Sequence, residues 1–327
     1  KAPQNDKAVV VVSFGSTFDD TRTKDIGGIE EAVAKAFPNR DFKRAFTSYI
    51  IMERLEKNKG IKVNDLPTTL KELKKAGYKD ILVQPTHLLH GEEYEQKVLT
   101  TVDKFKGDFD RIVVSDPLMV GKNDFAIAAS AVATQFPTLS KGDGIVLMGH
   151  GSPRDNNQSF GNTYKMLQET FDKMGLPVVV GTVEEVDTPN VDEVLEQIKA
   201  RGYKTVHMFP LMIVAGDHAN NDMYGDEEDS WKSLIEKMGV KTVGHLQGIG
   251  RNAAVQAIYV QHAVAAEAGV QRLLLISRTF FHGRTSFYVL EINTKILQRL
   301  YLDKIFCNFV SYRCCCACLT QYVNAIL

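Results

Sequence analysis

The sequence lacks the residues and motifs that mark several common protein classes. All five cysteines lie between Cys307 and Cys318, so the first 306 residues contain none and hold no CxxC pair of a zinc ribbon. The HExxH motif of metalloproteases and the GxxxxGK[ST] phosphate loop of nucleotide-binding proteins are also missing. In that part of the chain, any metal chemistry must therefore use histidine and carboxylate side chains, and no nucleotide is expected.

Long apolar runs and an excess of positive charge are absent as well. No stretch reaches the roughly 18 apolar residues needed to span a bilayer, and 39 Lys and Arg face 40 Asp and Glu, a net charge of −1. We therefore expect no membrane insertion and no nucleic-acid partner, which would normally require a basic surface. The chain begins Lys-Ala-Pro-Gln, without Met or a signal peptide. This start is typical of a processed chain and favours a periplasmic location, with a cytoplasmic one as the alternative.

The sequence does contain an apolar run that ends in a glycine-flanked histidine, at residues 144–152. Its Ile, Val, Leu and Met residues predict a buried strand, and the glycines beside His150 permit positive φ. Ligands of open α/β sheets bind beyond the carboxyl ends of strands, and His150 occupies such a position. The alternative is a histidine that only closes a turn.

An internal repeat supports a ligand-binding role for His150. Residues 77–85 (GYKDILVQP) match residues 202–210 (GYKTVHMFP) at an offset of 202 − 77 = 125. Carried forward, this offset places Glu93 opposite His218. The opening run from Val9 to Ser16 likewise mirrors the run that ends at Ser152. We therefore expect two related lobes that place Glu93 and His218 in equivalent positions.

The alternation of strand and helix patterns predicts an α/β protein with two Rossmann-like lobes, each a parallel sheet flanked by helices. The expected domains are residues 1–120, residues 121–270 and an extension over 271–327. The expected strands are 8–14, 42–48, 80–84, 111–115, 144–148, 177–183, 205–209 and 240–246. The expected helices are 26–37, 65–76, 125–136, 158–174, 191–200, 218–238 and 252–268.

The extension from residue 271 differs sharply from the rest in composition. It contains seven Lys and Arg residues and only two acidic residues, and neither half of the internal repeat includes it. We interpret it as unrelated to the functional core. The alternative is a soft-metal site in its Cys-Cys-Cys-Ala-Cys run, which begins at Cys314.

Four residues after predicted strands could meet in a cleft between the lobes: His150, Glu184, His218 and Glu93. Two imidazoles and a carboxylate suit Zn, Fe, Co or Ni and are poor ligands for Ca or Mg. We therefore predict His150, Glu184 and His218 as metal ligands. Each of these residues, taken alone, could instead be structural or lie at the surface.

Other polar residues near the cleft suggest further binding sites. Hydroxyls and helix N-termini bind anions well, so a substrate with many carboxylates would suit Ser13, Ser16, Thr17 and Ser152. Arg22, Arg154, Asn156, Asn157, Asn220 and Asn221 belong to the same rim. His87 and His90 lie in the loop before Glu93 and could bind metal or ligate haem. We predict His90 as the haem ligand, in a site that subunits of a homo-oligomer would share.

Four linked motifs carry a family resemblance: 149–152 (GHGS), 180–184 (VGTVE), 215–222 (AGDHANND) and 91–95 (GEEYE). Together they resemble the anaerobic cobalt chelatases of cobalamin biosynthesis, which are class II chelatases related to ferrochelatase. The resemblance extends from about residue 8 to 270 and implies two lobes that hold a tetrapyrrole and a metal between them. By that resemblance, His150 and His218 are metal-binding histidines and catalytic, Glu93 is the acidic cleft residue, and Glu184 is a further ligand.

The resemblance implies insertion of Co²⁺ into sirohydrochlorin without ATP, with the cobalt as substrate metal. Metal insertion exchanges two pyrrole N–H protons for one divalent ion, so the protein must hold the ion and accept protons. Insertion of iron or nickel into the same substrate is one alternative, because raw affinity does not select cobalt. The other alternative is a two-lobed metal- or haem-binding protein without enzymatic activity.

Overall fold

The computed structural model describes residues 5–152, 162–184, 187–269, 278–281 and 284–287. The chain divides into two units, Lys1–Gly269 and Val270–Leu327. Within the second unit, β9 (Arg278–Phe281) and β10 (Arg284–Phe287) form an antiparallel pair. The cysteines of the extension lie outside the described residues. In the part of the chain that is described, no helix is long and apolar enough to cross a bilayer.

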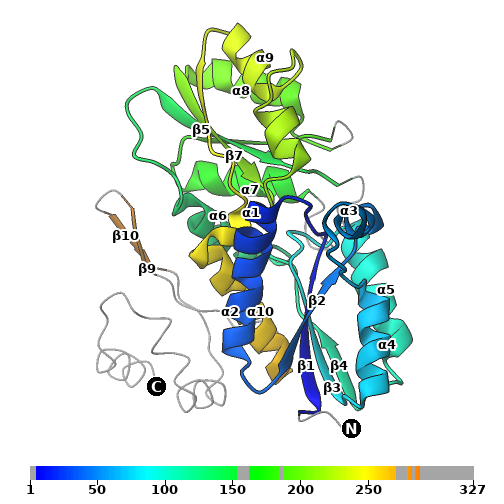
Figure 1. Cartoon of the computed structure of the whole chain (residues 1–327). Coiled ribbons are helices and arrows are strands. Elements are labelled where there is room, and N and C mark those ends of the chain that lie inside the picture. Colours follow the sequence, from blue (N-terminus) through cyan, green and yellow to red (C-terminus); the bar gives the residue numbers. More distant parts are fainter. Residues whose placement is uncertain (1–4, 153–161, 185–186, 270–277, 282–283, 288–327) are drawn as a thin grey trace, which may run out of the picture. The chain divides into compact units, whose positions relative to one another are not determined.

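Two four-stranded parallel sheets organise the first unit (Figure 1). The first sheet has the order β2-β1-β3-β4 and the second β6-β5-β7-β8, so the two lobes share one topology. The strands are β1 (Lys7–Ser13), β2 (Asp41–Phe46), β3 (Asp80–Pro85), β4 (Arg111–Val114), β5 (Asp143–Gly149), β6 (Val178–Thr182), β7 (Thr205–Leu211) and β8 (Lys241–Gly244). This arrangement confirms the predicted fold class, and the shared strand order explains the sequence repeat.

Helices flank both sheets. In the first lobe they are α1 (Asp19–Thr21), η1 (Arg22–Ile26), α2 (Gly27–Ala36), α3 (Tyr49–Lys59), α4 (Leu66–Ala76), η2 (Tyr94–Leu99) and α5 (Thr100–Phe105). They continue with α6 (Lys122–Ala133), α7 (Thr163–Lys173), α8 (Val191–Arg201), η3 (His218–Met223), α9 (Trp231–Lys237), η4 (Ile249–Arg251) and α10 (Ala253–Ala268). Of these, η1, η2 and η3 are π-helical turns and η4 is a 3₁₀ turn.

The central strands are buried on both faces, as expected for parallel sheets covered by helices. Every residue from Ala8 to Val12 is fully buried, and so is every residue from Ile145 to Met148. Leu66, Leu70 and Leu73 of α4 pack on one face of the first sheet. Continuous apolar runs such as Val9–Val12 therefore mark the central strands of each sheet. Most candidate site residues follow the carboxyl ends of these strands.

Two helical segments differ from the sequence-based expectation. Helix α3 was not predicted, although Ser48 caps it by accepting the Ile51 N–H at 3.3 Å and Gly60 ends it at φ +65°. The helix expected over 218–238 is wrong, because it is divided into η3 and α9. Ser230 begins α9 by accepting the Ser233 N–H at 3.1 Å, and a separate cap starts a new helix.

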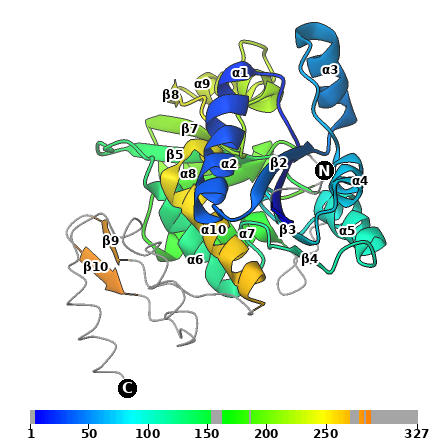
Figure 2. The same ribbon diagram turned by 60° about the horizontal axis from the view of Figure 1, so that its bottom comes forward.

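The last helix of each half lies against elements of the other half (Figure 2). Helix α10 follows the second sheet but packs against α2, β3 and β4 of the first lobe. Helix α6 follows the first sheet but packs against α7. Just beyond α6, the Phe136 ring lies tilted against the rings of Phe171 and Phe209, with centroids 6.2 and 5.7 Å away. The sequence predicts that residues 252–268 belong to the second lobe. In the structure these residues instead pack on the first lobe and so connect the two lobes.

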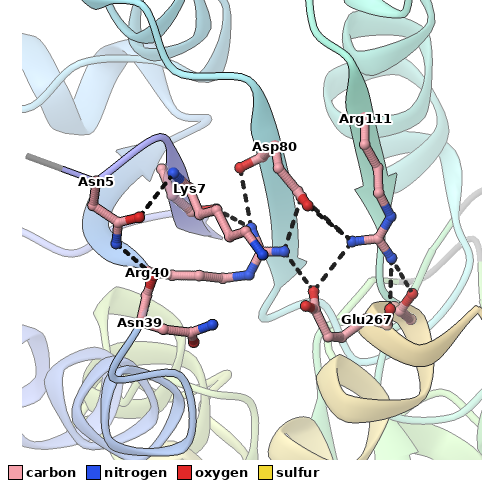
Figure 3. A network of polar contacts seen from close by, with 9 residues as sticks. Asn5, Lys7, Asn39, Arg40, Asp80, Arg111 and Glu267 are labelled. Carbon is pink, nitrogen blue, oxygen red and sulfur yellow. Dashed lines mark hydrogen bonds and ion pairs between the residues drawn. The ribbon is translucent and has the colours of Figure 1, made fainter. Parts of the chain in front are cut away.

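A network of charged side chains fastens the end of α10 to the first sheet (Figure 3). The Arg40 side chain is fully buried and donates to Asp80 Oδ1 at 2.8 Å and Glu267 Oε2 at 2.6 Å. It also donates to the carbonyls of Ala8 and Asp80. Arg111 contacts the same two carboxylates, each at 3.3 Å. Arg40 therefore joins β1, β3 and α10 through one guanidinium.

Replacing Arg40 by methionine should lower the free energy of unfolding by about 3 kcal/mol, because breaking a buried ion-pair network leaves desolvated charge behind. Urea denaturation would measure the loss. Arg201→Met is the matched control: its exposed pair with Asp172, at 3.0 Å, should contribute less than about 1 kcal/mol. Equal losses in the two variants would show that the Arg40 network adds no more than a surface ion pair.

Candidate active site

A cavity of about 520 Å³ lies at the carboxyl ends of the central strands of both sheets. Its lining comes mainly from the segments that follow β1, β3 and β5 and from the end of β7 onward, at residues 14–18, 86–89, 91–94, 150–152, 211–214 and 216–218. Helix α3 adds Ile50, Ile51 and Arg54. Binding beyond strand carboxyl ends is the general rule for such sheets, and both lobes contribute to one cavity.

The turn after β5 presents His150 to this cavity. Gly151 has φ +92°, and its N–H donates to the Tyr164 hydroxyl at 3.1 Å. A Cβ at Gly149 would lie 2.2 Å from the Tyr164 ring, so the strand must end in glycine there. The first lobe repeats this turn, with Phe14 in place of His150 and Gly15 at φ +108°. The local geometry is therefore common to both lobes, and only the second has an imidazole at this position.

Hydrogen bonds orient both imidazoles for metal binding. His150 Nδ1 lies 3.0 Å from the Gly151 carbonyl, and His218 Nδ1 lies 2.6 Å from Asp222 Oδ2. Oxygens of these kinds only accept, so Nδ1 carries the proton in each neutral ring. Each Nε2 then keeps a lone pair for a metal, in the usual pattern of metal-binding histidines.

His150, Glu184 and His218 lie together as a group of potential ligands. One ligand atom from each lies within 4.8 Å of the other two. The His150 and His218 ring centroids are 4.8 Å apart at 82°, and His150 Nε2 lies 3.7 Å from Glu184 Oε1. All three side chains are 40–51% exposed, and His150 and His218 line the cavity. An open N,N,O set suits borderline ions such as Co²⁺ and leaves positions for an incoming ligand.

Glu93 comes from the other lobe and precedes η2, as His218 begins η3. Its Oε1 accepts hydrogen bonds from Thr47 Oγ1 and from His87 Nε2, the latter at 3.2 Å. Burial alone would raise the pKa of the Glu93 carboxyl. The hydrogen bond and charge of His87, the Thr47 hydrogen bond and the charge of His150 outweigh burial, so this pKa lies below its ordinary value. Glu93 therefore remains a carboxylate at neutral pH.

The four hydroxyl residues proposed for substrate binding all line the cavity. Ser13 and Ser16 are nearly fully buried. Ser13 accepts from Thr86 Oγ1 at 2.9 Å, and Ser16 accepts the Phe18 N–H at 3.2 Å. The Ser152 N–H donates to Asp187 Oδ2 at 2.7 Å. The backbone of these turns is thus fixed at the cavity wall.

The remaining rim residues mostly support the loops. Arg22 is buried and donates to the carbonyls of Ser16 and Thr17, each at 3.4 Å. Asn220 donates to the carbonyls of Ala215 and Gly216. Arg154, Asn156 and Asn157 lie outside the described residues. Substrate contacts from the described rim must therefore come mainly from other side chains.

His87 and His90, considered together in the sequence, have different surroundings. His87 contacts Glu93 and lines the cavity. His90 Nε2 lies 3.0 Å from Glu95 Oε1, and its ring meets the Tyr94 ring edge-on at 5.0 Å between centroids. An imidazole engaged by Glu95 would have to release that contact to bind haem iron through Nε2. Haem binding at His90 stays a prediction.

Sequence patterns did not indicate several residues of the cavity. Arg54 lies on α3, and Thr47, which donates to the cavity residue Glu93, follows β2. No motif stood out at either place. Phe14, Phe18 and Ile50 are 52%, 39% and 62% exposed and line the cavity. A large apolar residue that stays exposed is the signal that could have found them, but exposure is visible only in the folded chain.

Two parallel-sheet lobes that face one cavity, with two histidines and a carboxylate opposite a second carboxylate, define a protein built to hold a metal ion beside a larger ligand. The chain belongs to the cobalt chelatase (CbiK) family, whose model matches residues 7–267. This confirms the family resemblance seen in the sequence.

Known relatives match most of the chain. It is 36% identical over 256 residues to the sirohydrochlorin cobaltochelatase of Salmonella typhimurium, covering 78% of this chain and 94% of the relative. It is 29% identical over 266 residues to the sirohydrochlorin cobaltochelatase CbiKC of Nitratidesulfovibrio vulgaris, covering 81% and 92%. Among solved structures, the sirohydrochlorin chelatase SirB of Bacillus subtilis subspecies spizizenii, in complex with cobalt, shares the fold. Its TM-score is 0.51 at 16% identity, covering 80% of this chain and 95% of SirB.

Proposed function

We propose that this protein is a sirohydrochlorin cobaltochelatase, which inserts Co²⁺ into sirohydrochlorin without a nucleotide. The observation that carries this proposal is the pairing of the His150–Glu184–His218 group with Glu93 across one cavity. The family and the 36% identical relative support cobalt and sirohydrochlorin as the substrates.

The residues divide the chemistry between the lobes. The second lobe holds Co²⁺ through the two Nε2 atoms and the Glu184 carboxylate. Insertion breaks two N–H bonds of the macrocycle, forms bonds from its nitrogens to the ion, and releases two protons. Glu93 accepts a proton at Oε2, which has no hydrogen-bond partner among the described residues. Each proton then passes to water at the open side of the cavity.

The cavity wall fits a flat macrocycle with charged edges. Exposed Phe14, Phe18 and Ile50 offer apolar surface to the ring, and burying such surface stabilises binding. Arg54 is the only lysine or arginine among the described lining residues, and no ion pair of Arg54 is found in the described structure. Its guanidinium is therefore available for a substrate carboxylate.

Replacing Arg54 by alanine should raise the KM for sirohydrochlorin about fivefold, since an exposed ion pair contributes about 1 kcal/mol. The value of kcat should change little, because Arg54 acts on the edge of the substrate and not on the metal. Steady-state kinetics at fixed Co²⁺ would measure both. Lys57→Ala removes a charge from an exposed position of α3 outside the cavity lining and should leave KM unchanged. Equal KM values in the two variants would contradict a specific role for Arg54.

The function itself is tested by metallation. Sirohydrochlorin is mixed with catalytic amounts of protein and Co²⁺, Fe²⁺ or Ni²⁺ in turn, and the absorption spectrum of the product is followed. We expect many turnovers with Co²⁺. Faster insertion of iron or nickel would favour those alternatives, and tetrapyrrole binding without turnover would favour a binding protein.

Haem binding, a homo-oligomer and a periplasmic location go beyond this proposal and stay predictions. So does the expectation that residues 271–327 lie outside the functional core.

A further inference from the structure

His87 is a largely buried imidazole beside the proposed base. It lines the cavity but belongs neither to the metal group nor to the substrate contacts proposed above. Its side chain is 11% exposed, and Nε2 lies 3.2 Å from Glu93 Oε1. Its Nδ1 is buried and has no hydrogen-bond partner in the described structure. A buried nitrogen without a partner costs free energy, and the contact of Nε2 with Glu93 offsets part of this cost.

The backbone at His87 is fixed from two sides. The His87 carbonyl accepts the Tyr259 hydroxyl of α10 and the Leu118 N–H, both at 2.9 Å. Tyr259 is fully buried and also donates to the Thr86 carbonyl at 2.9 Å. The imidazole therefore extends toward Glu93 from a backbone that is held from two sides.

The proton on His87 must lie toward Glu93. A carboxylate only accepts, so Nε2 donates and Nδ1 is unprotonated when the ring is neutral. Thr47 donates to the same Glu93 oxygen. Two donors on Oε1 orient the carboxylate and leave Oε2 as its available oxygen.

We propose that His87 is a positioning residue for the chelation step, holding Oε1 of Glu93 so that Oε2 accepts the N–H proton of the tetrapyrrole. This proposal rests on the proposed function. We assign His87 no part in bond making, because its Nε2 contacts the carboxylate of Glu93.

Electrostatics gives this positioning a measurable consequence. The groups that lower the Glu93 pKa are His87 and Thr47 of its own lobe and His150 of the other, and they act against burial. Without His87, only the Thr47 hydrogen bond and the charge of His150 remain, among the groups named here, to oppose the increase in the Glu93 pKa that burial causes. The pKa of Glu93 then rises, and the acid limb of the kcat–pH profile moves to higher pH.

The test compares His87→Leu with His87→Gln. Leucine removes the donor, while the glutamine amide can place an N–H near the position of Nε2. We expect His87→Leu to lower kcat at least tenfold at neutral pH, with the acid limb shifted upward. His87→Gln should recover most of the kcat on the alkaline plateau. KM for the tetrapyrrole should change little in either variant.

His262→Leu is the matched control. His262 is also 11% exposed, also has a buried Nδ1 without a partner in the described structure, and lies 4.0 Å from the carboxylate of Asp124, outside the cavity lining. It should affect stability without moving the pH profile. Circular dichroism of the same samples checks folding.

The outcomes separate this proposal from the proposed function. Wild-type turnover with an unmoved acid limb in His87→Leu, or equal kcat losses in the leucine and glutamine variants, would overturn the positioning role alone. Absence of sirohydrochlorin metallation by the wild type would overturn both. A shifted limb with recovery by glutamine supports the proposal.

Discussion

Alanine at His150 or at His218 should reduce cobalt insertion at least tenfold, because each substitution removes one nitrogen from a group of three ligands. A loss of about 1.4 kcal/mol in transition-state stabilisation already corresponds to a factor of ten. Removing one of three metal contacts should exceed that value. The effect should appear in kcat/KM for Co²⁺ and in the affinity for Co²⁺ measured by titration calorimetry.

His245→Ala serves as the control for both histidine variants. His245 lies 3.1 Å from His207 and stacks on Phe209, away from the cavity lining. Its replacement removes an imidazole of the same lobe but no predicted ligand, so Co²⁺ affinity should be unchanged. If His150→Ala and His218→Ala fold normally and keep full activity, the ligand assignment is wrong.

Glu93→Gln should lower kcat at least a hundredfold, in line with general-base contributions of about 10²–10⁴. Glutamine keeps the shape of the side chain but cannot accept the proton. Because the Glu93 pKa lies below the ordinary value of 4.5, protonation of Glu93 itself should lower kcat only as the pH falls below that value. This contribution to the acid limb should be absent from the residual activity of the variant.

Tetrapyrrole affinity separates the catalytic role from a binding role. We expect the Kd for sirohydrochlorin, measured by fluorescence quenching, to change much less than kcat. Glu196→Gln, at an exposed position of α8, controls for loss of a carboxylate elsewhere. Near-normal kcat with an unchanged pH profile in Glu93→Gln would exclude Glu93 as the base.

The lowered pKa of Glu93 also affects the free energy of unfolding. Its pKa in the folded state is lower than in the unfolded chain, so folding favours the carboxylate. The contribution to stability is present above the unfolded value and is lost as the pH falls through the folded value. The wild type should therefore be more stable than Glu93→Gln at neutral pH, and the difference should shrink as the pH falls through the folded pKa of Glu93.

Apolar runs and the internal repeat were sufficient to predict the sheets. Val9–Val12 and Ile145–Met148 are buried on both faces, so their sequences are uninterrupted by polar residues. The repeat also predicted equivalent positions for Glu93 and His218, which lie at the starts of η2 and η3. Helix α3 escaped prediction because Tyr49 and Ile50 remain exposed and blur the apolar face expected of a surface helix.

Side-chain direction limited the prediction of the site. His87 and His90 are three residues apart in an irregular loop, where spacing does not determine which side chains share a face. Their acidic partners, Glu93 and Glu95, lie two residues apart at the start of η2, and the fold assigns one histidine to each. The role of Arg40 was also invisible in the sequence, because its partners Asp80 and Glu267 are distant along the chain.

The crossing of α6 and α10 between the halves has a consequence for biosynthesis. Part of the first sheet has no helix to cover it until residues 253–268 have left the ribosome, because α10 supplies that cover. The amino-terminal half therefore cannot finish folding while the second half is still being made, despite having its complete set of strands. Such long-range closure slows folding and leaves apolar surface open to chaperones during translation. The two halves should also unfold in one transition, since neither keeps its packing when the other is lost.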